Sequence, residues 1–75
     1  MRMTIRGMKM EIRVNGEKRR CDGPIAVGDL LEALGIQPGL VVVERNLRIV
    51  PRERVADEMI QDGDSLEIIR MVGGG

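Results

Sequence analysis

The residues of this chain with the clearest chemical potential are its last three, Gly73, Gly74 and Gly75. A glycine run at a chain end is often only a loose tail. Here the run follows directly on a segment with the pattern of a final strand, so a tail without side chains would project from a folded domain. Such a tail fits a narrow channel in a partner protein, because no Cβ atom blocks its approach.

The reactive group at the end of such a tail is the carboxylate of Gly75. A carboxylate is a poor electrophile, but its attack on the α-phosphate of ATP forms an acyl-adenylate from which AMP departs readily. A sulfur nucleophile, such as an enzyme persulfide, can then take that place, and reduction leaves a nucleophilic thiocarboxylate. The partner would supply ATP, Mg²⁺ and transition-state stabilisation. The chain itself offers no nucleophile–base pair, so we expect a carrier and not an enzyme.

Composition narrows the alternatives. The 75 residues are enough for one domain, and the absence of Phe, Tyr and Trp argues against modules that stack nucleic-acid bases on aromatic rings. Twelve basic and twelve acidic residues balance, so no overall field draws the protein to DNA or to an anionic membrane. With no His and only Cys21, neither a zinc site nor an internal disulfide is expected, which fits the reducing cytoplasm. The longest apolar run, Leu40 to Val43, is too short to span a bilayer.

The first half of the chain predicts a hairpin followed by a helix. From Met8 to Val14 apolar and charged residues alternate strictly, which is typical of a strand with one face on a core. Asn15-Gly16 predicts a tight turn, and Glu17 to Cys21 forms the return strand, which Asp22-Gly23-Pro24 then breaks. Met8 and Met10 are both expected in the core.

Helical spacing follows this hairpin. Val27, Leu30, Leu31 and Leu34 recur at i, i+3, i+4 and i+7, and Gly35 supplies a left-handed C-cap. The residue at the N-cap position is Ala26, which cannot satisfy the free amides, so we expect the first turn to fray.

The second half predicts three further strands. Leu40 to Glu44 is apolar and β-branched, and we expect it to be buried on both faces. Residues 45–48 form a turn, Ile49-Val50 a short strand, and residues 52–57 a helical turn or loop. Asp62-Gly63-Asp64 is a tight turn into a last strand of about residues 65–72, in which Leu66, Ile68 and Arg70 share one face and Ile69 and Met71 the other. The first and last strands can pair in parallel at the centre of the sheet.

These elements predict an α+β fold, with one main helix packed across one face of a mixed sheet of four or five strands. Residues 8–72 form the domain and residues 73–75 a flexible tail. Residues 1–7 form an N-terminal extension, either disordered or an added edge strand, and Met8 is a candidate for the true start.

From Met8 to Gly75 the sequence resembles the thiamine-biosynthesis sulfur carrier (ThiS) family, which has a ubiquitin-like β-grasp fold. The most specific resemblances are Val50-Pro51-Arg52-Glu53 and the terminal glycines. The other matching segments are Met10 to Glu17, Val27 to Gly35, Val42 to Asn46 and Asp62 to Ile69.

The resemblance implies a set of partners and a site. A ThiF-like E1-type enzyme adenylates the last glycine, a persulfide enzyme donates sulfur, and the carrier docks on ThiG, the thiazole synthase. By position, Gly75 is the acceptor, Gly73 and Gly74 thread the channel, and Met71 and Val72 contact the partner. The free carrier is expected to be a monomer that binds no metal or cofactor. Two departures from the family pattern are Ala26 at the N-cap and Asn46-Leu47 in place of Asn-Gly, so a tight type I′ turn is not expected there.

Several alternatives remain open from the sequence. The small subunit of molybdopterin synthase and tRNA-thiolation carriers share the fold and the glycine end, and a ubiquitin-like modifier or a plain binding module is a further possibility. Cys21, beside Arg19 and Arg20, is either a sulfur relay with a favoured thiolate or, more simply, a half-buried strand residue. The basic cluster of residues 18–20 is most simply a solvated edge.

Overall fold

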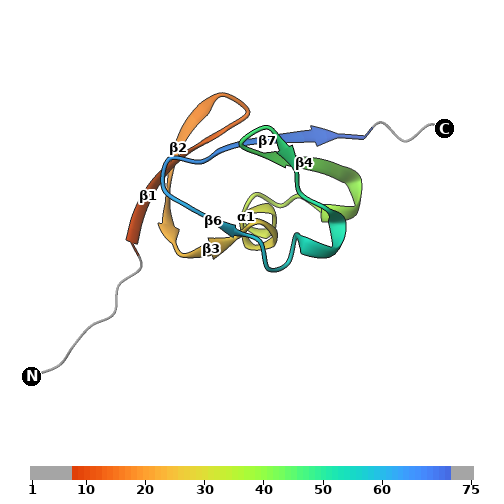
Figure 1. The fold of residues 1–75 in the computed structure, drawn as a ribbon, viewed down its shortest axis with the longest axis horizontal. Coiled ribbons are helices and arrows are strands. Elements are labelled where there is room, and N and C mark those ends of the chain that lie inside the picture. The colour runs from red at the N-terminus through yellow and green to blue at the C-terminus, as the bar shows by residue number, and fades with distance from the viewer. Residues whose placement is uncertain (1–7, 72–75) are drawn as a thin grey trace, which may run out of the picture.

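A computed structural model describes residues 8–71 of the chain. Figure 1 shows helix α1 lying on one side of the sheet that contains β1, β4 and β7, with β7 running to the C-terminal end. The elements, in chain order, are β1 (Met8–Val14), β2 (Glu17–Gly23), β3 (Ile25–Ala26), α1 (Val27–Ala33), a 3₁₀ turn (Pro38–Leu40), β4 (Val41–Arg45), β5 (Arg48–Ile49), a 3₁₀ turn (Arg52–Arg54), β6 (Met59–Ile60) and β7 (Ser65–Arg70). The predicted α+β, β-grasp arrangement is confirmed.

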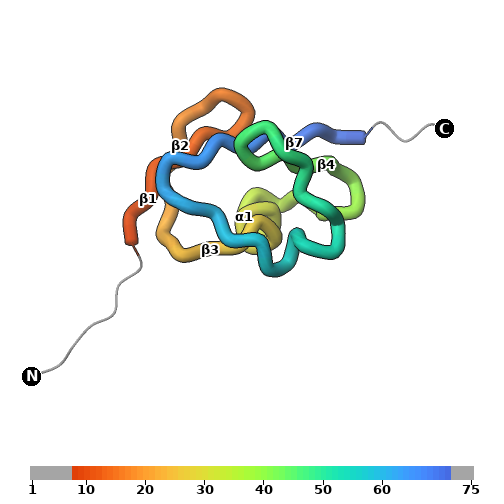
Figure 2. The backbone as a smooth tube through the Cα atoms, in the orientation of Figure 1, coloured from red at the N-terminus to blue at the C-terminus, as the bar shows by residue number. Residues whose placement is uncertain are grey.

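The main sheet has five strands in the order β2-β1-β7-β4-β5. β1 and β7 pair in parallel, with Arg13 opposite Ser65 and Val14 opposite Leu66, as predicted. β7 is also antiparallel to β4, from Val41 opposite Arg70 to Arg45 opposite Leu66. The path of the chain in Figure 2 shows how β7, last in sequence, returns to lie between the first strand and the fourth. β7 is therefore paired with β1 at its start, at Ser65 and Leu66, and with β4 from Leu66 to Arg70.

The first hairpin forms as predicted, with one extension and one correction. Asn15 and Gly16 have φ of 51° and 85°, the left-handed pair of a tight turn. β2 continues two residues past Cys21, to Gly23, and the Met10 side chain packs over Gly23, where a Cβ atom would lie only 2.5 Å from the sulfur. Met8 is 64% exposed, so its predicted place in the core is wrong. It pairs with Gly23, which has no side chain to cover it.

The helix packs as its periodicity predicts, with Val27, Leu30 and Leu31 buried and Gly35 at φ 73°. The expectation that its first turn frays is not supported, because other segments satisfy its amides. The Val27 N–H donates to the Glu58 carbonyl at 2.9 Å and the Gly28 N–H to the Val55 carbonyl at 2.8 Å. A Cβ at Gly28 would lie 3.2 Å from that Val55 oxygen, so glycine permits this close approach.

β4 begins at Val41 and is not buried on both faces, which corrects the prediction. Val41 and Val43 point into the core, while Val42 and Glu44 are half-buried on the other face. Leu40 belongs to the preceding 3₁₀ turn and is 46% exposed. The helix covers only one face of the sheet, so β4 alternates like a strand at a surface.

The turn between β4 and β5 corrects a second prediction. Asn46 and Leu47 have φ of 53° and 71°, and Arg45 pairs with Arg48, so the connection is a two-residue turn of the type I′ kind despite the leucine. Asn46 is fixed by neighbours distant in sequence. Its N–H donates to the Ser65 carbonyl at 2.7 Å and its side-chain oxygen accepts from the Ser65 N–H at 2.9 Å.

A two-stranded ladder of β3 with β6 was not predicted from the sequence. Ala26 of β3 and Ile60 of β6 are both buried. The residues of the core cluster are Met10, Ile12, Val14, Val27, Leu30, Leu31, Val41, Val43, Val50, Ile60 and Leu66. Within residues 8–71, no helix is long and apolar enough to cross a membrane. The extension 1–7, the end of the last predicted strand at Val72, and the tail 73–75 lie outside the described residues.

Candidate functional site

The described part of the candidate site is the end of β7. Leu66 and Ile68 face the core, whereas Ile69 and Met71 face away from it and are each 45% exposed, as the alternation predicts. The last backbone bond in this region runs from the Met71 N–H to the Leu40 carbonyl at 2.9 Å. The chain is thus paired to Met71, one of the two predicted partner-contact residues. The other, Val72, and the predicted tail residues, Gly73, Gly74 and Gly75, lie outside the described residues.

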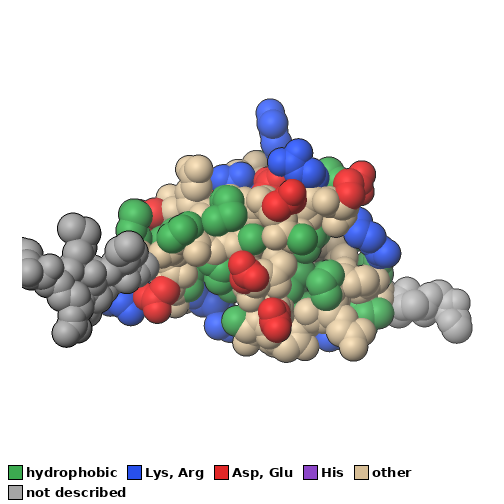
Figure 3. Space-filling model, turned by 90° about the horizontal axis from the view of Figure 1, so that it is seen from below, with side chains coloured by type: hydrophobic (Ala, Val, Ile, Leu, Met, Phe, Trp, Pro, Cys, Tyr) green, Lys and Arg blue, Asp and Glu red, His purple; other side chains and the backbone are tan. Residues whose placement is uncertain are grey.

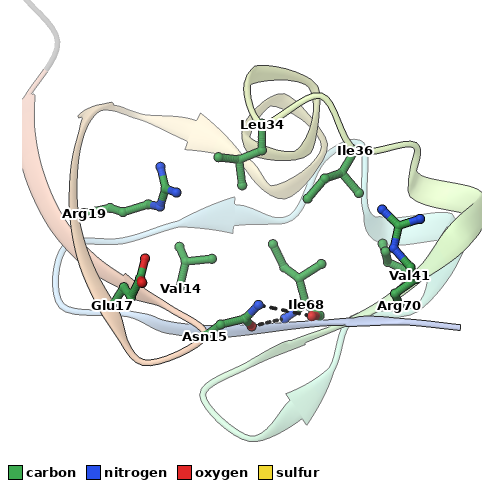
Figure 4. A pocket seen from close by; sticks show the side chains of 9 residues that line it. All are labelled: Val14, Asn15, Glu17, Arg19, Leu34, Ile36, Val41, Ile68 and Arg70. Carbon is green, nitrogen blue, oxygen red and sulfur yellow. Dashed lines mark hydrogen bonds between the residues drawn. The ribbon is translucent and has the colours of Figure 1, made fainter.

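Asn15 holds β7 close to its end, which the sequence did not reveal. Its side-chain oxygen accepts the Ile68 N–H at 2.7 Å, and its side-chain N–H donates to the Ile68 carbonyl at 3.3 Å (Figure 4). Its backbone N–H also donates to the Leu66 carbonyl at 2.9 Å. Asn-Gly predicts only a turn. Asn15 and Ile68 are 53 positions apart in the sequence, which explains why no local pattern predicts the second role.

The other end of β7 is fixed by a buried carboxylate. Asp64, 7% exposed, accepts at Oδ2 from Arg45 Nε at 2.6 Å and from the Gln61 N–H at 2.8 Å, and at Oδ1 from Asn46 Nδ2 at 2.9 Å. Arg45 also reaches Glu58 at 3.2 Å. The sequence predicted Asp64 only as a turn residue.

Asp64 and Arg45 each stabilise the charged form of the other. Burial pushes the pKa of Asp64 upward, but the hydrogen bonds from Gln61, Arg45 and Asn46 outweigh it and hold the pKa of the carboxyl below its ordinary value. The hydrogen bond to Asp64 raises the pKa of the Arg45 guanidinium further. Asp64 is therefore ionised at neutral pH and fixes the point where β7 begins.

A groove opens beside the end of β7 on the side of the helix, with a volume of about 520 Å³. It lies next to Leu34 and Ile36, where the chain leaves α1 after Ala33 and Gly35 adopts a positive φ. Figure 4 shows its lining, which is Val14, Asn15, Glu17, Arg19, Leu34, Ile36, Val41, Ile68 and Arg70.

Cys21 matches the simpler of its two interpretations. Its side chain is half-buried and packs against the core. Burial, and then the nearby charge of Asp22, raise the pKa of the thiol, so the neighbouring arginines do not favour a thiolate. Lys18, Arg19 and Arg20 are exposed on the edge strand β2.

Charge is mixed over the surface. Figure 3, which views the molecule from below relative to Figure 1, shows basic, acidic and hydrophobic side chains interspersed, without a large field of one sign. Among residues 8–71 no three His, Cys, Asp or Glu side chains gather in a way that could hold a metal ion. The described part of the chain thus presents a strand end and a groove beside it.

β7 is the central strand of a five-stranded sheet, and the sequence after it ends in three glycines. Known proteins with this arrangement can now be compared with the chain. The model of the ThiS family matches residues 12–75, which is most of the chain. The chain belongs to the ThiS family. The resemblance drawn from Val50 to Glu53 and from the terminal glycines is thereby confirmed.

Three similar proteins illustrate the family. The sulfur carrier protein ThiS of Escherichia coli is 33% identical over 66 residues, which cover 88% of this chain and 100% of that protein. The crystal structure of the thiamine biosynthesis protein ThiS from Geobacter metallireducens superposes with a TM-score of 0.77 at 36% identity, covering 88% of this chain and all of that one. A thiazole synthase of Paramagnetospirillum magneticum is 44% identical over 66 residues, and these are 88% of this chain but 20% of that protein. The chain therefore spans about a fifth of that relative's length.

Proposed function

We propose that this member of the ThiS family is a sulfur carrier for thiamine thiazole synthesis, with the carboxylate of Gly75 as its working group. The observation that carries the proposal is the fixation of β7. The strand is paired with β1 and β4 and clamped by Asn15, and the backbone is bonded as far as Met71, four residues before Gly75. A partner that binds this rigid body therefore receives the tail from a defined point.

The chemistry proceeds in three steps. A Gly75 carboxylate oxygen attacks the α-phosphorus of ATP on a ThiF-like E1-type enzyme, and pyrophosphate leaves as the acyl-adenylate forms. The terminal sulfur of an enzyme persulfide then attacks the acyl carbon, and AMP departs. The product is an acyl disulfide, Gly75–C(O)–S–S–enzyme. A thiol then attacks its enzyme-side sulfur, forms a new disulfide with that sulfur, and releases the thiocarboxylate on Gly75. The partner enzyme binds the ATP and Mg²⁺ and stabilises the charge that develops.

The carrier's contribution is geometric. Gly73 and Gly74 carry no side chains, so the tail fits a channel that larger residues would block. Met71 and Val72 precede them, and the exposed Met71 supplies apolar contact at the channel mouth. On this proposal the chain is a co-substrate of its partner enzymes.

A ThiG-like thiazole synthase is the proposed acceptor of the sulfur. A relative named thiazole synthase contains a region 44% identical to this chain. This supports a functional connection between this chain and a thiazole synthase. The ThiS match favours the thiamine role over a molybdopterin-synthase subunit, a tRNA-thiolation carrier or a modifier. We place the free carrier in the cytoplasm, because a single cysteine suits a reducing compartment, and propose that it is a monomer, because a carrier must visit two enzymes in turn.

The test is an intact-mass measurement on the untagged chain after incubation with a ThiF-like enzyme, ATP, Mg²⁺ and a persulfide donor. We expect a gain equal to the replacement of one oxygen by sulfur, located at Gly75 by fragmentation. A variant lacking Gly75 and a variant extended by one residue beyond it are the controls, and neither should gain sulfur. An equal gain in the extended variant would contradict the proposal.

A further inference from the structure

The groove beside the end of β7 has an arginine at each end and aliphatic side chains between them. Figure 4 shows Arg19 and Arg70 at opposite ends of the groove, with Leu34 and Ile36 along one side and Val14 and Ile68 along the other. Arg19 comes from β2 and Arg70 from the last residue of β7. Two separate elements thus bring guanidinium groups to one hollow.

Both arginines face the groove because of the strand register. Arg19 pairs with Ile12 and Arg70 with Val41, and residues directly opposite each other project on the same side of a sheet. Ile12 and Val41 are buried beneath the helix, so their partners point to the same layer. The next residue along β2, Arg20, pairs with the exposed Glu11 and points to the opposite face.

Neither guanidinium is neutralised within the described fold. The ion pairs formed among residues 8–71 use other cations, namely Lys9, Lys18, Arg45 and Arg54. Glu17 is the one carboxylate in the lining, and it forms no ion pair with either arginine. The groove therefore carries a net positive charge, whereas the whole chain is balanced.

The lining also favours a polypeptide over a small anion. Of its five aliphatic residues, Val14 and Val41 are already buried, whereas Leu34, Ile36 and Ile68 are half-buried, so an occupant with aliphatic side chains gains by covering these three. Both arginines are exposed, and an isolated small anion there would remain largely solvated. A carboxylate held within a bound segment would lose that solvation and accept two N–H groups from one guanidinium.

The position of the groove, at the end of β7, points to a partner that binds the C-terminal tail. Arg70 lies in the wall, three residues before Gly73, where the tail of the proposed function begins. A partner that encloses the tail must therefore lie beside the groove.

We propose that the Arg19–Arg70 groove receives an acidic, aliphatic segment of the enzyme that activates Gly75, so that these two arginines select the partner. The inference rests on the proposed function, because it takes the tail-binding enzyme as the occupant. The partner's carboxylates pair with the guanidinium groups, and its aliphatic side chains cover Leu34, Ile36 and Ile68.

The test is the affinity of the ThiF-like activating enzyme for the double variant Arg19→Glu/Arg70→Glu. The matched control is Arg13→Glu/Arg20→Glu, which changes the net charge equally but on the opposite face, since Arg13 pairs with Lys18 and Arg20 with Glu11. All four side chains are exposed, so circular dichroism and thermal unfolding should show that both variants fold. We expect binding to weaken about a hundredfold in the groove variant and less than threefold in the control.

The same titrations separate the two proposals. Wild-type chain that binds and gains sulfur, together with equal losses in the two double variants, would overturn the groove and leave the carrier function standing. Wild-type chain that neither binds nor gains sulfur would overturn both. Binding of AMP or inorganic phosphate to the free carrier that is lost in Arg19→Glu/Arg70→Glu would assign the groove to a small anion and also overturn the acidic segment.

Discussion

Two tight turns flank β7, and the same residue type serves each of them differently. Asn15 and Asn46 both have positive φ, and the side-chain oxygen of each accepts a backbone N–H of β7, from Ile68 and from Ser65 respectively. Asn15 is followed by Gly16, which adopts this conformation without strain, whereas Asn46 is followed by Leu47. The second turn is imposed by its surroundings.

The two asparagines differ in the other hydrogen-bond partners of their side chains. The side-chain amide of Asn46 donates to Asp64, which is buried and also bound by Arg45 and Gln61. Asn15 is exposed and bonds only to β7. The start of β7 is thus fixed by a buried ionic network. Near its end the strand is paired with β4, and the one side chain that holds it is the exposed Asn15, next to an open groove. The buried polar contacts are thus concentrated at the start of β7. Near its end, Ile69 and Met71 stay exposed.

Among the substitutions that test this comparison, Asp64→Ala should have the largest effect on the free energy of unfolding. The substitution leaves Arg45, Asn46 and the Gln61 N–H without their shared acceptor, and we expect it to destabilise the fold by about 3 kcal/mol. Urea unfolding followed by circular dichroism measures this. Asp57→Ala, at an exposed carboxylate 3.9 Å from Arg54, is the control and should cost less than about 0.5 kcal/mol. Equal losses would show that the network is not the anchor.

The second prediction concerns pH. Because the folded-state pKa of Asp64 is lowered, its contribution is complete above the unfolded-state value, about 4, and is lost as pH falls through the lower folded-state pKa. Stability should therefore decline from about pH 4 downward. Urea midpoints between pH 2 and pH 7 should show a weaker acid dependence in Asp64→Asn than in the wild type. An unchanged slope would mean that other carboxylates dominate acid unfolding.

The two turns can be compared directly with Asn46→Gly and Asn15→Gly. Glycine keeps the positive φ and removes only the side chain, so each variant reports the hydrogen bonds to β7. We expect about 2 kcal/mol for Asn46→Gly, which also leaves Asp64 Oδ1 without a donor, and about 1 kcal/mol for Asn15→Gly. Chemical denaturation at pH 7 measures both. The reverse order would contradict the assignment of the stronger anchor to the start of β7.

The smallest effect should come from Leu47→Gly. Leu47 is 89% exposed at φ 71°, so glycine relieves strain without losing packing, although it also adds entropy to the unfolded chain. We expect a net stabilisation of about 0.5 kcal/mol, read from the thermal midpoint. Gly16→Leu, at φ 85° in the other turn, should destabilise the fold by about 1 kcal/mol or more. Destabilisation by Leu47→Gly would show that the leucine makes a contact that stabilises the fold.

Sequence patterns predicted the elements that are determined by residues close together in the sequence. The alternation from Met8 to Val14 gave β1 its bounds, Asn15-Gly16 its turn, and the spacing from Val27 to Leu34 the buried face of α1. The parallel pairing of β1 with β7 followed from the order of elements and the crossover helix.

The predictions that failed depend on distant partners. The Asn46-Leu47 turn is set by Ser65 and Asp64, some 18 residues away, and overrides the poor preference of leucine for positive φ. The amides at the start of α1 are satisfied by Val55 and Glu58, which no helix-capping pattern includes. The groove is likewise assembled from four separate elements and the loop after α1, so its two arginines looked like ordinary strand residues in the sequence.

The most direct test of the central claim follows a labelled sulfur atom through the carrier. The chain would be loaded with an isotopically labelled persulfide by a ThiF-like enzyme, repurified, and mixed with a ThiG-like thiazole synthase and its other substrates, with the sulfur in protein and product measured by mass spectrometry. We predict that the label leaves Gly75 and appears in the thiazole, one atom per chain, and that chain lacking Gly75 delivers none. Thiazole formed without label, or label retained on Gly75, would contradict the role of this chain as the sulfur carrier.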